Sequence, residues 1–439
     1  MKKTLASQTP TEMPQAQSRP GSTIRPGLLR AFVVVLLLVG TLQVGLAWSE
    51  IISSGMDIQQ DYIAAQRLLV GGDIYAPIQP AEVAALGVDE ATGFGMRLNV
   101  HPPFTALLLA PLSLLPFPAA TLIWTLGCVL LLCGLVYLLA KELELPLPSP
   151  WWQIAALLML SWYPVWLHLH LGQFTILLAA LIFGVWYALR RGRDALAGGL
   201  LAGAIVLKIF PVVLLADAVI NRRWRMLWAA LAVTLVLLLI QTTIGPRQWP
   251  EYFAHVAPKN AAEWMNSPRN ASLASIGMRL FVGNDEVAPV FDLPSAEPLT
   301  RAALYAIALA CVAVVLWRRR GARDLTGEYS LWLCAMVLLS PLSWEHSFIF
   351  LLLPLGAIWQ RLRAWPGAWR RVPRLFALLT VGLSLLPAEM ILLSIKRYYW
   401  PARMPGWVGL LAPGVAVLVC GFIAIVVTLW CQPIQADEG

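Results

Sequence analysis

The sequence predicts an all-α polytopic membrane protein, and three observations support that prediction. Of the 439 residues, 59% are hydrophobic and only 13% are charged, whereas a soluble domain has roughly 25% charged and 45–50% apolar residues. The apolar residues are spread along the whole chain, and the charges occur as short Arg/Lys clusters between apolar runs. A soluble fold of this composition would expose large apolar patches, so we set that class aside.

The basic clusters predict the orientation of the chain. The net charge of +8 does not indicate a nucleic-acid partner, because the clusters flank apolar runs as the positive-inside rule requires. A span needs about 20 apolar residues, and we predict about twelve spans, with both termini cytoplasmic. The expected spans are 29–48, 116–140, 151–169, 173–190, 195–208, 210–221, 225–243, 299–317, 327–342, 345–361, 374–395 and 405–430.

The domain organisation follows from these spans. Residues 1–28 are polar and rich in Pro, Ser and Gln, which predicts a disordered cytoplasmic tail. Residues 29–431 form the membrane domain, with outer loops at about 49–115 and 244–298, and 432–439 form a second cytoplasmic tail. The first apolar run lacks a small-residue cleavage site, so we interpret it as a retained helix. The six cysteines show no zinc-site spacing.

Two acidic residues follow the first span directly. Asp57 and Asp61 are four residues apart, so on a helix their side chains would share one face, with Cβ atoms about 5–6 Å apart. Such carboxylates could share a proton, position a base, or hold Mg²⁺ or Mn²⁺ through their oxygens. The alternative is a solvated amphipathic helix on the membrane surface.

Lys208 lies within an apolar run, where a cation costs roughly 2.5–3.5 kcal/mol. Pro211 breaks the helix there, and a broken helix in a membrane lines a polar cavity or is buried in protein. We therefore expect Lys208 to bind an anion such as a phosphate, unless it reaches out to the interface. All five histidines fall on the outer side in this topology, which indicates either a polar site there or simple tolerance of His at interfaces. They are His101, His168, His170, His255 and His346.

Several weak motifs occur together in one order. They are Asp57 followed by Gly71-Gly72-Asp73-Ile74-Tyr75; His101-Pro102-Pro103-Phe104; Gly172-Gln173-Phe174-Thr175; Leu207-Lys208-Ile209-Phe210-Pro211; Asn270-Ala271-Ser272-Leu273; and Ser340-Pro341-Leu342-Ser343-Trp344-Glu345-His346. With these motifs the chain resembles glycosyltransferase family 87, the polyprenyl-phosphate-mannose-dependent α-mannosyltransferases of the GT-C fold, over about residues 30–430. Asp61 and His101 depart from it, because Tyr is common at both places.

The resemblance implies a GT-C bundle that transfers a hexose, mannose, from a polyprenyl-phosphate donor to a glycolipid or glycan acceptor on the outer face of the cell membrane, with inversion. It implies Asp57 as the general base. With it we expect Asp61 as a second carboxylate and Lys208, His346 and Arg269 at the donor phosphate. The expected substrate-binding residues are His101, Gln173, Tyr62, Tyr75, Asn270, Trp344 and Glu345.

Other readings stay open at this point. We expect no dedicated metal ligands, although a divalent cation, Mg²⁺ or Mn²⁺, could act as a cofactor. Transfer of a pentose or another sugar, or glycosylation of protein, would use similar residues. A transporter or flippase of the lipid carrier would also use broken helices, but internal inverted repeats favour that class and none is found. A structural scaffold would not gather polar residues on one side.

Overall fold

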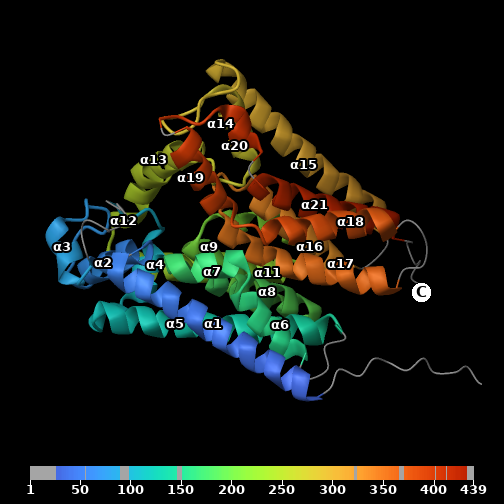
Figure 1. Ribbon diagram of the computed structural model, residues 1–439, viewed down its shortest axis with the longest axis horizontal. Coiled ribbons are helices and arrows are strands. Elements are labelled where there is room, and N and C mark those ends of the chain that lie inside the picture. Colours follow the sequence, from blue (N-terminus) through green and yellow to red (C-terminus); the bar gives the residue numbers. More distant parts are fainter. Residues whose placement is uncertain are drawn as a thin grey trace, which may run out of the picture.

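The chain folds into a bundle of helices, as its composition predicts. The computed structural model describes residues 26–54, 56–88, 98–145, 151–320, 324–364, 370–400, 402–411 and 413–432. Most of both predicted tails, 1–28 and 432–439, therefore lies outside the described residues. Within them the secondary structure is helical apart from turns and one isolated β-bridge between Val287 and Met404 (Figure 1). The predicted all-α fold is confirmed.

The helices follow one another through short breaks. The first half contains α1 (Pro26–Ser54), α2 (Ile58–Leu69), α3 (Pro80–Ala85), α4 (Pro103–Leu109), α5 (Phe117–Glu142), α6 (Trp151–Leu160), α7 (Tyr163–Leu171), α8 (Thr175–Arg190), α9 (Asp194–Leu207), α10 (Leu215–Ile220) and α11 (Trp224–Ile244). The second half contains α12 (Gln248–Glu251), α13 (Ala257–Trp264), α14 (Leu273–Phe281), α15 (Glu297–Arg319), α16 (Leu325–Leu339), α17 (Leu352–Ala364), α18 (Arg371–Ser384), α19 (Ala388–Tyr399), α20 (Gly406–Leu410) and α21 (Pro413–Cys431). Short 3₁₀ segments include η1 (Leu112–Leu114), η2 (Phe210–Leu214) and η5 (Glu345–Leu351), and η3 (Tyr252–Val256) is a π-helical turn.

The helix lengths identify a multi-pass membrane protein but do not reproduce twelve simple spans. Among the described residues, five helices are long and apolar enough to cross a membrane. A sixth span results if α6 and α7, bent by 59° at their junction, are counted as one. Four shorter apolar helices, Thr175–Arg190, Asp194–Leu207, Phe210–Ile220 and Leu325–Leu339, coincide with other predicted spans. The count of twelve is therefore not confirmed.

Proline explains several of the interruptions. The run 374–395 was predicted as one helix, but α18 ends at Ser384 and α19 begins at Ala388, directly after Pro387. The run 345–361 begins as the 3₁₀ segment η5 and becomes α-helical at Leu352, followed by Pro354. Pro removes a backbone donor and clashes with the preceding turn, so apolar composition alone overestimates helix continuity here.

The break at Lys208 is present as expected. Helix α9 ends at Leu207, Lys208 has an extended backbone (φ −149°, ψ 130°), and η2 begins at Phe210. The backbone N–H groups near this break and the Lys208 side chain therefore lie outside any continuous helix. Such irregular backbone at membrane depth needs a protein-lined cavity.

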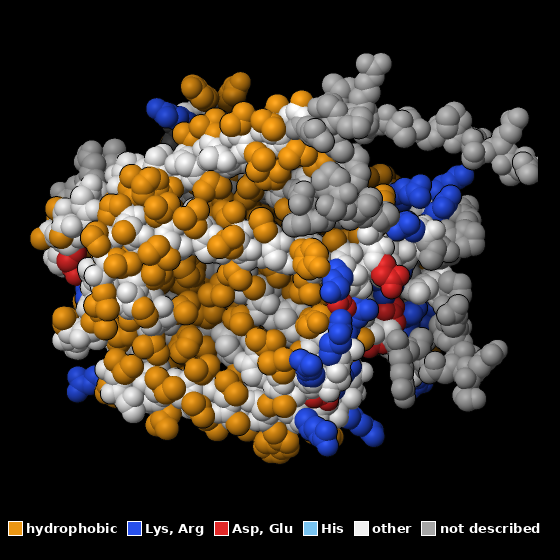
Figure 2. Space-filling view, turned by 90° about the horizontal axis from the view of Figure 1, so that it is seen from below, with side chains coloured by type: hydrophobic (Ala, Val, Ile, Leu, Met, Phe, Trp, Pro, Cys, Tyr) orange, Lys and Arg blue, Asp and Glu red, His pale blue; other side chains and the backbone are white. Residues whose placement is uncertain are grey.

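The surface separates into an apolar belt and a charged end. Large apolar side chains of α1, α5 and α11 point outward, among them Leu38, Leu130 and Leu239, each about two-thirds exposed or more. Most Lys and Arg side chains visible in Figure 2 gather at one end of the molecule, beside this apolar surface. In Figure 1 that end holds the C-terminal parts of α15 and α17, while α2, α4, α12 and α13 lie at the opposite end. An apolar belt of this kind matches a hydrocarbon environment.

Candidate active site

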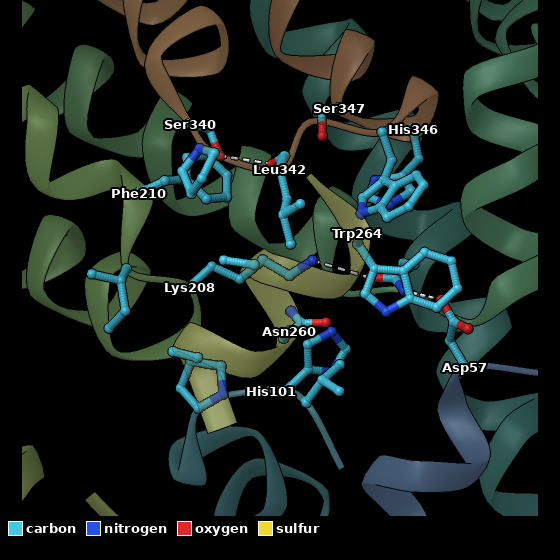
Figure 3. A pocket seen from close by; sticks show the side chains of 18 of the residues that line it. Asp57, His101, Lys208, Phe210, Asn260, Trp264, Ser340, Leu342, His346 and Ser347 are labelled. Carbon is cyan, nitrogen blue, oxygen red and sulfur yellow. Dashed lines mark hydrogen bonds between the residues drawn. The ribbon is translucent and has the colours of Figure 1, made fainter. Parts of the chain in front are cut away.

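A cavity of about 520 Å³ opens at the end of the bundle opposite the charged end, where the Lys and Arg side chains gather and which is called the Arg-rich end below. Its walls come from chain segments far apart in sequence: the start of α2, the turn before α4, the α7–α8 turn, the break after α9, η3 with α13, and the loop before η5. Residues that line it include Asp57, Gln60, His101, Gln173, Lys208, Phe210, Asn260, Trp264, Arg269, Trp344 and His346 (Figure 3). Seven of the residues predicted from sequence are brought together here.

Asp57 and Lys208 are joined through one glutamine. The Gln173 side chain donates from Nε2 to Oδ2 of Asp57, and its Oε1 accepts from Nζ of Lys208 at 3.1 Å. Asp57 directly precedes α2 without capping it by its side chain, and Lys208 directly follows α9, so the Gln173 amide links two helix ends. The Asp57 carboxylate and the Lys208 ammonium group are thus held on the same cavity by hydrogen bonds to a single residue, Gln173.

A glycine makes this approach geometrically possible. Gly172 ends α7 with φ +70°, in the left-handed region that glycine adopts without strain. A Cβ at this position would lie 2.7 Å from the Cβ of Ile58, the first residue of α2. The absence of a side chain therefore lets the α7–α8 turn pack directly against the start of α2, which brings Gln173 to Asp57.

The environment of Asp57 sets its proton affinity through opposing effects. Burial raises the pKa of the Asp57 carboxyl above its ordinary value. The nearby charge of His101, the hydrogen bond from Gln173 and the charge of Lys208 act in the opposite direction, and Asp61 adds a smaller upward effect. A carboxylate whose pKa is raised towards neutrality accepts a proton better than a free one, which suits a general base.

Asp61 faces a different set of partners from Asp57. Its side chain is 1% exposed and accepts from Nδ1 of His101, at 2.8 and 3.0 Å for the two oxygens. Oγ1 of Thr105 lies 2.9 Å from Oδ1 of the same carboxylate. The solvated amphipathic helix considered above is therefore not what forms, because nearly all of the first half of α2 is buried.

The cavity lining also contains a His and an aromatic–cation group. Nδ1 of His346 lies 2.7 Å from Oγ1 of Thr175, which fixes the imidazole at the pocket. Trp264 and Trp344 pack edge to face with ring centroids 5.8 Å apart, and the guanidinium of Arg269 lies 5.5 and 5.8 Å from the two centroids. Cation–π contacts of this kind help to hold an Arg side chain in place.

Four predicted substrate residues lie in the walls and not on the pocket surface. Tyr62 packs on Phe117 and donates to the carbonyl of Leu115, and Tyr75 donates to the carbonyl of His101 at 2.9 Å. Asn270 bonds the backbone around it, including the Pro341 carbonyl at 2.9 Å. Glu345 is buried at the start of η5. Tyr62, Tyr75 and Asn270 thus stabilise the backbone of the pocket walls by hydrogen bonds.

Some lining residues were missed by sequence reasoning. Gln60 is 1% exposed, lines the pocket and accepts from the Val100 backbone at 3.0 Å. Asn260, on α13, also lines it. The signal for Gln60 was its position three residues after Asp57 on the same helix, which places both on one side. No sequence signal indicated Asn260, because residues 244–298 show no clear hydrophobic periodicity.

The described residues contain no group of three or more His, Cys, Asp or Glu side chains placed to hold a metal ion. Oδ2 of Asp57 accepts a hydrogen bond from Gln173, whereas both oxygens of Asp61 have protein partners, His101 and Thr105.

The chain resembles characterised proteins over most of its length. Residues 99–341 match the model of Glycosyltransferase family 87. A polyprenol-phosphate-mannose-dependent α-(1-2)-phosphatidylinositol pentamannoside mannosyltransferase of Mycolicibacterium smegmatis is 24% identical over 395 residues, covering 89% of this chain and 90% of that protein. A polyprenol-phosphate-mannose-dependent α-(1-2)-phosphatidylinositol mannoside mannosyltransferase of Mycobacterium tuberculosis is 26% identical over 289 residues, covering 61% and 63%.

A solved structure is also similar. ArnT from Cupriavidus metallidurans, bound to undecaprenyl phosphate, aligns with 92% of this chain and 76% of its own, at 14% identity and a TM-score of 0.38.

Proposed function

Because this chain belongs to glycosyltransferase family 87, we propose that it transfers mannose from a polyprenyl-phosphate donor to a hydroxyl of a glycolipid or glycan acceptor. The observation that carries this proposal is the cavity in which Asp57, Gln173 and Lys208 are linked by hydrogen bonds. A carboxylate and a cation on one cavity are the two kinds of group that glycosyl transfer from a phosphate requires. The donor is supported by the similar mannosyltransferases, which depend on polyprenol-phosphate-mannose.

Asp57 acts as the general base in this mechanism. The acceptor hydroxyl loses its proton to the Asp57 carboxylate while its oxygen forms a bond to the anomeric carbon. The bond between that carbon and the phosphate oxygen breaks on the opposite face, so configuration inverts and polyprenyl phosphate is released. General-base assistance of this kind is typically worth about 10²–10⁴-fold in rate.

Fixed cations stabilise the leaving phosphate. Lys208 is linked to Asp57 through Gln173, and Arg269, which lines the same cavity, is held against Trp264 and Trp344. Charge that develops on the phosphate as the bond breaks is stabilised best by groups that are already oriented and shielded from water. His346, held by Thr175, completes this side of the cavity.

The distribution of apolar and charged residues supports a route for the lipid tail and an orientation in the membrane. Apolar residues line the pocket beside Lys208, among them Phe210, Val212 and Phe253, and Val212 and Phe253 are about half exposed. They offer a route for a prenyl chain between pocket and bilayer. We propose that the pocket faces the extracytoplasmic side and both termini the cytoplasm, because the Arg-rich end lies opposite the pocket (Figures 1 and 2).

The decisive experiment uses purified full-length protein in lipid nanodiscs with radiolabelled polyprenyl-phosphate mannose and a mannoside acceptor. Asp57→Asn keeps the shape of the side chain and removes the base, so we expect transfer to fall by about 10²–10⁴-fold with donor binding retained. Wild-type transfer by Asp57→Asn would refute the assignment. Movement of the intact donor across the bilayer of sealed proteoliposomes, without transfer, would favour a flippase.

The same assay tests the role of a divalent cation. Because Lys208 and Arg269 supply positive charge at the pocket, we expect transfer to continue in the presence of EDTA. Complete loss in EDTA, restored by Mg²⁺ or Mn²⁺, would assign the phosphate charge to a metal instead.

A further inference from the structure

The wall formed by α2 and α4 carries polar atoms that the mechanism above does not use. We infer that His101, held by Asp61, binds a second oxygen of the acceptor beside the reacting hydroxyl, so that the acceptor must carry a vicinal diol. This inference rests on the proposed function and specifies the chemistry of its acceptor. His101 is the residue that touches substrate, and Asp61 is a positioning residue that acts through it.

The imidazole of His101 is held rigidly on one side. Its Nδ1 meets both oxygens of the Asp61 carboxylate, at 2.8 and 3.0 Å, and Thr105 lies 2.9 Å from the same carboxylate. The ring also packs edge-on against Phe174, with centroids 5.7 Å apart and planes at 86°. A carboxylate only accepts hydrogen bonds, so Nδ1 carries the hydrogen and Nε2 is the atom left for the pocket.

The backbone of His101 is held as firmly as its ring. The carbonyl accepts from the hydroxyl of Tyr75 at 2.9 Å, and the N–H donates to Oδ1 of Asn99 at 2.9 Å. Every other polar atom of the residue is thus engaged by protein. A side chain fixed to this degree, with one polar atom facing a cavity, has the preorganisation that substrate-contacting groups require.

A second polar side chain on the same wall has an unused donor. Gln60 is 1% exposed and lines the pocket; its Oε1 accepts from the Val100 backbone, while Nε2 is buried and has no hydrogen-bond partner. A buried donor without a partner costs about 1–3 kcal/mol, and such groups in folded proteins are normally met by water or ligand. An additional oxygen of the acceptor would meet it.

The position of this wall favours the acceptor over the donor phosphate. Of the two neighbouring cationic groups that lower the pKa of Asp57, His101 has the larger effect and Lys208 the smaller one. In Figure 3, Asp57 and His101 lie on the lower side of the pocket and His346 on the upper side, with Lys208 between them. The reacting hydroxyl and the leaving phosphate must lie on opposite faces of the transferred sugar, so the groups beside Asp57 contact the acceptor. A hydroxyl adjacent to the reacting one is then within reach of His101.

The test compares an intact acceptor with deoxy analogues. The full-length protein in nanodiscs is assayed with polyprenyl-phosphate mannose and octyl α-mannoside, and the linkage of the product identifies the reacting hydroxyl. Octyl mannosides that lack a hydroxyl at either adjacent carbon are then compared with the intact probe. For the wild-type protein we expect one of them to lose about 10- to 100-fold in kcat/KM, as for loss of a hydrogen bond to a buried polar group.

Two variants of His101 separate substrate contact from structural support. His101→Asn keeps an amide near the Nδ1 position, so it can still bond Asp61, but it has nothing at the Nε2 position. His101→Gln places an amide nitrogen near the Nε2 position. We expect His101→Asn to treat the deoxy and intact probes nearly alike, and His101→Gln to keep part of the discrimination. Asp61→Asn should weaken it and add little more when His101→Asn is already present.

The outcomes are distinct. Equal use of intact and deoxy probes by the wild-type protein, or unchanged discrimination in His101→Asn, would overturn the inference. So would fully additive effects of Asp61→Asn and His101→Asn. If the wild-type protein transferred no mannose to any acceptor, the proposed function itself would be refuted. Size-exclusion profiles establish that each variant is folded, and Lys259→Met, an exposed position outside the pocket lining, serves as the unaffected control.

Discussion

Replacing Lys208 by Met tests the proposed phosphate site while keeping the length of the side chain. Nζ of Lys208 faces the cavity and lies 3.1 Å from Oε1 of Gln173. A phosphate oxygen about 4 Å from this ammonium group gains about 4 kcal/mol at an effective dielectric constant of about 20. Part of that gain is offset by desolvation of both charges, so we expect the donor to bind about 10²–10³-fold more weakly.

The same substitution has a second, independent consequence at Asp57. The charge of Lys208 lowers the pKa of the Asp57 carboxyl, against the larger upward effect of burial. Without Lys208 the pKa of Asp57 rises further. A base acts only when it is ionised, so its contribution is present above this pKa and is lost as the pH falls through it. The acid limb of kcat should therefore move to higher pH in Lys208→Met.

Donor titrations and pH–rate profiles on the nanodisc-embedded protein measure both effects. Lys259→Met removes the same charge from an exposed position on α13 that does not line the cavity, and it should change neither quantity. Unchanged donor affinity in Lys208→Met would refute the phosphate role. A weaker donor affinity with an unmoved acid limb would show instead that Lys208 and Asp57 do not influence each other.

Three further substitutions test the scaffold behind these groups. Gln173→Leu removes the hydrogen bonds that link Asp57 and Lys208, so we expect kcat/KM to fall by about 10- to 100-fold. Part of the loss should be recovered at higher pH, because the hydrogen bond from Gln173 lowers the pKa of the Asp57 carboxyl. Wild-type kinetics in this variant would contradict the role of Gln173. Gly172→Ala should lower kcat at least about tenfold, because the new Cβ would lie 2.7 Å from the Cβ of Ile58. The control Gly192→Ala is also at positive φ but has open space around its Cβ, so it should lower only the stability. Equal losses of kcat in both variants would disprove the packing argument. Arg279→Met leaves four backbone carbonyls without the buried guanidinium that donates hydrogen bonds to them. We expect the free energy of unfolding to fall by about 3 kcal/mol or more, measured as a lower unfolding temperature in detergent. An unchanged unfolding temperature would contradict this stabilising role of Arg279.

The broken helix at Lys208 illustrates a feature that local sequence predicts well. Pro211 and a cation within an apolar run each disfavour a continuous helix, and the structure has the break at that place. Helix ends elsewhere were predicted less well. The predicted span 374–395 is two helices, because an apolar composition satisfies the membrane whether or not the backbone bends at Pro387.

The roles of the two acidic residues illustrate the opposite case. Because they are four residues apart, Asp57 and Asp61 were expected on one helix face, where they could share a proton, position a base or hold a cation. In the fold Asp57 is bonded to Gln173, 116 residues away, and Asp61 to His101, 40 residues away. Helical periodicity places side chains on a face but carries no information on what packs against that face.

Hydropathy and charge placement alone determined that this chain is a helical membrane protein, since lipid requires apolar segments whose backbone hydrogen bonds are satisfied internally. The order of short motifs was also enough to indicate its family. Only the tertiary structure decided which polar groups share a cavity and which, like Tyr62 and Asn270, hold its walls. The physical reason is that a hydrogen bond depends on distances of about 3 Å, and those are set by how helices distant in sequence pack against one another.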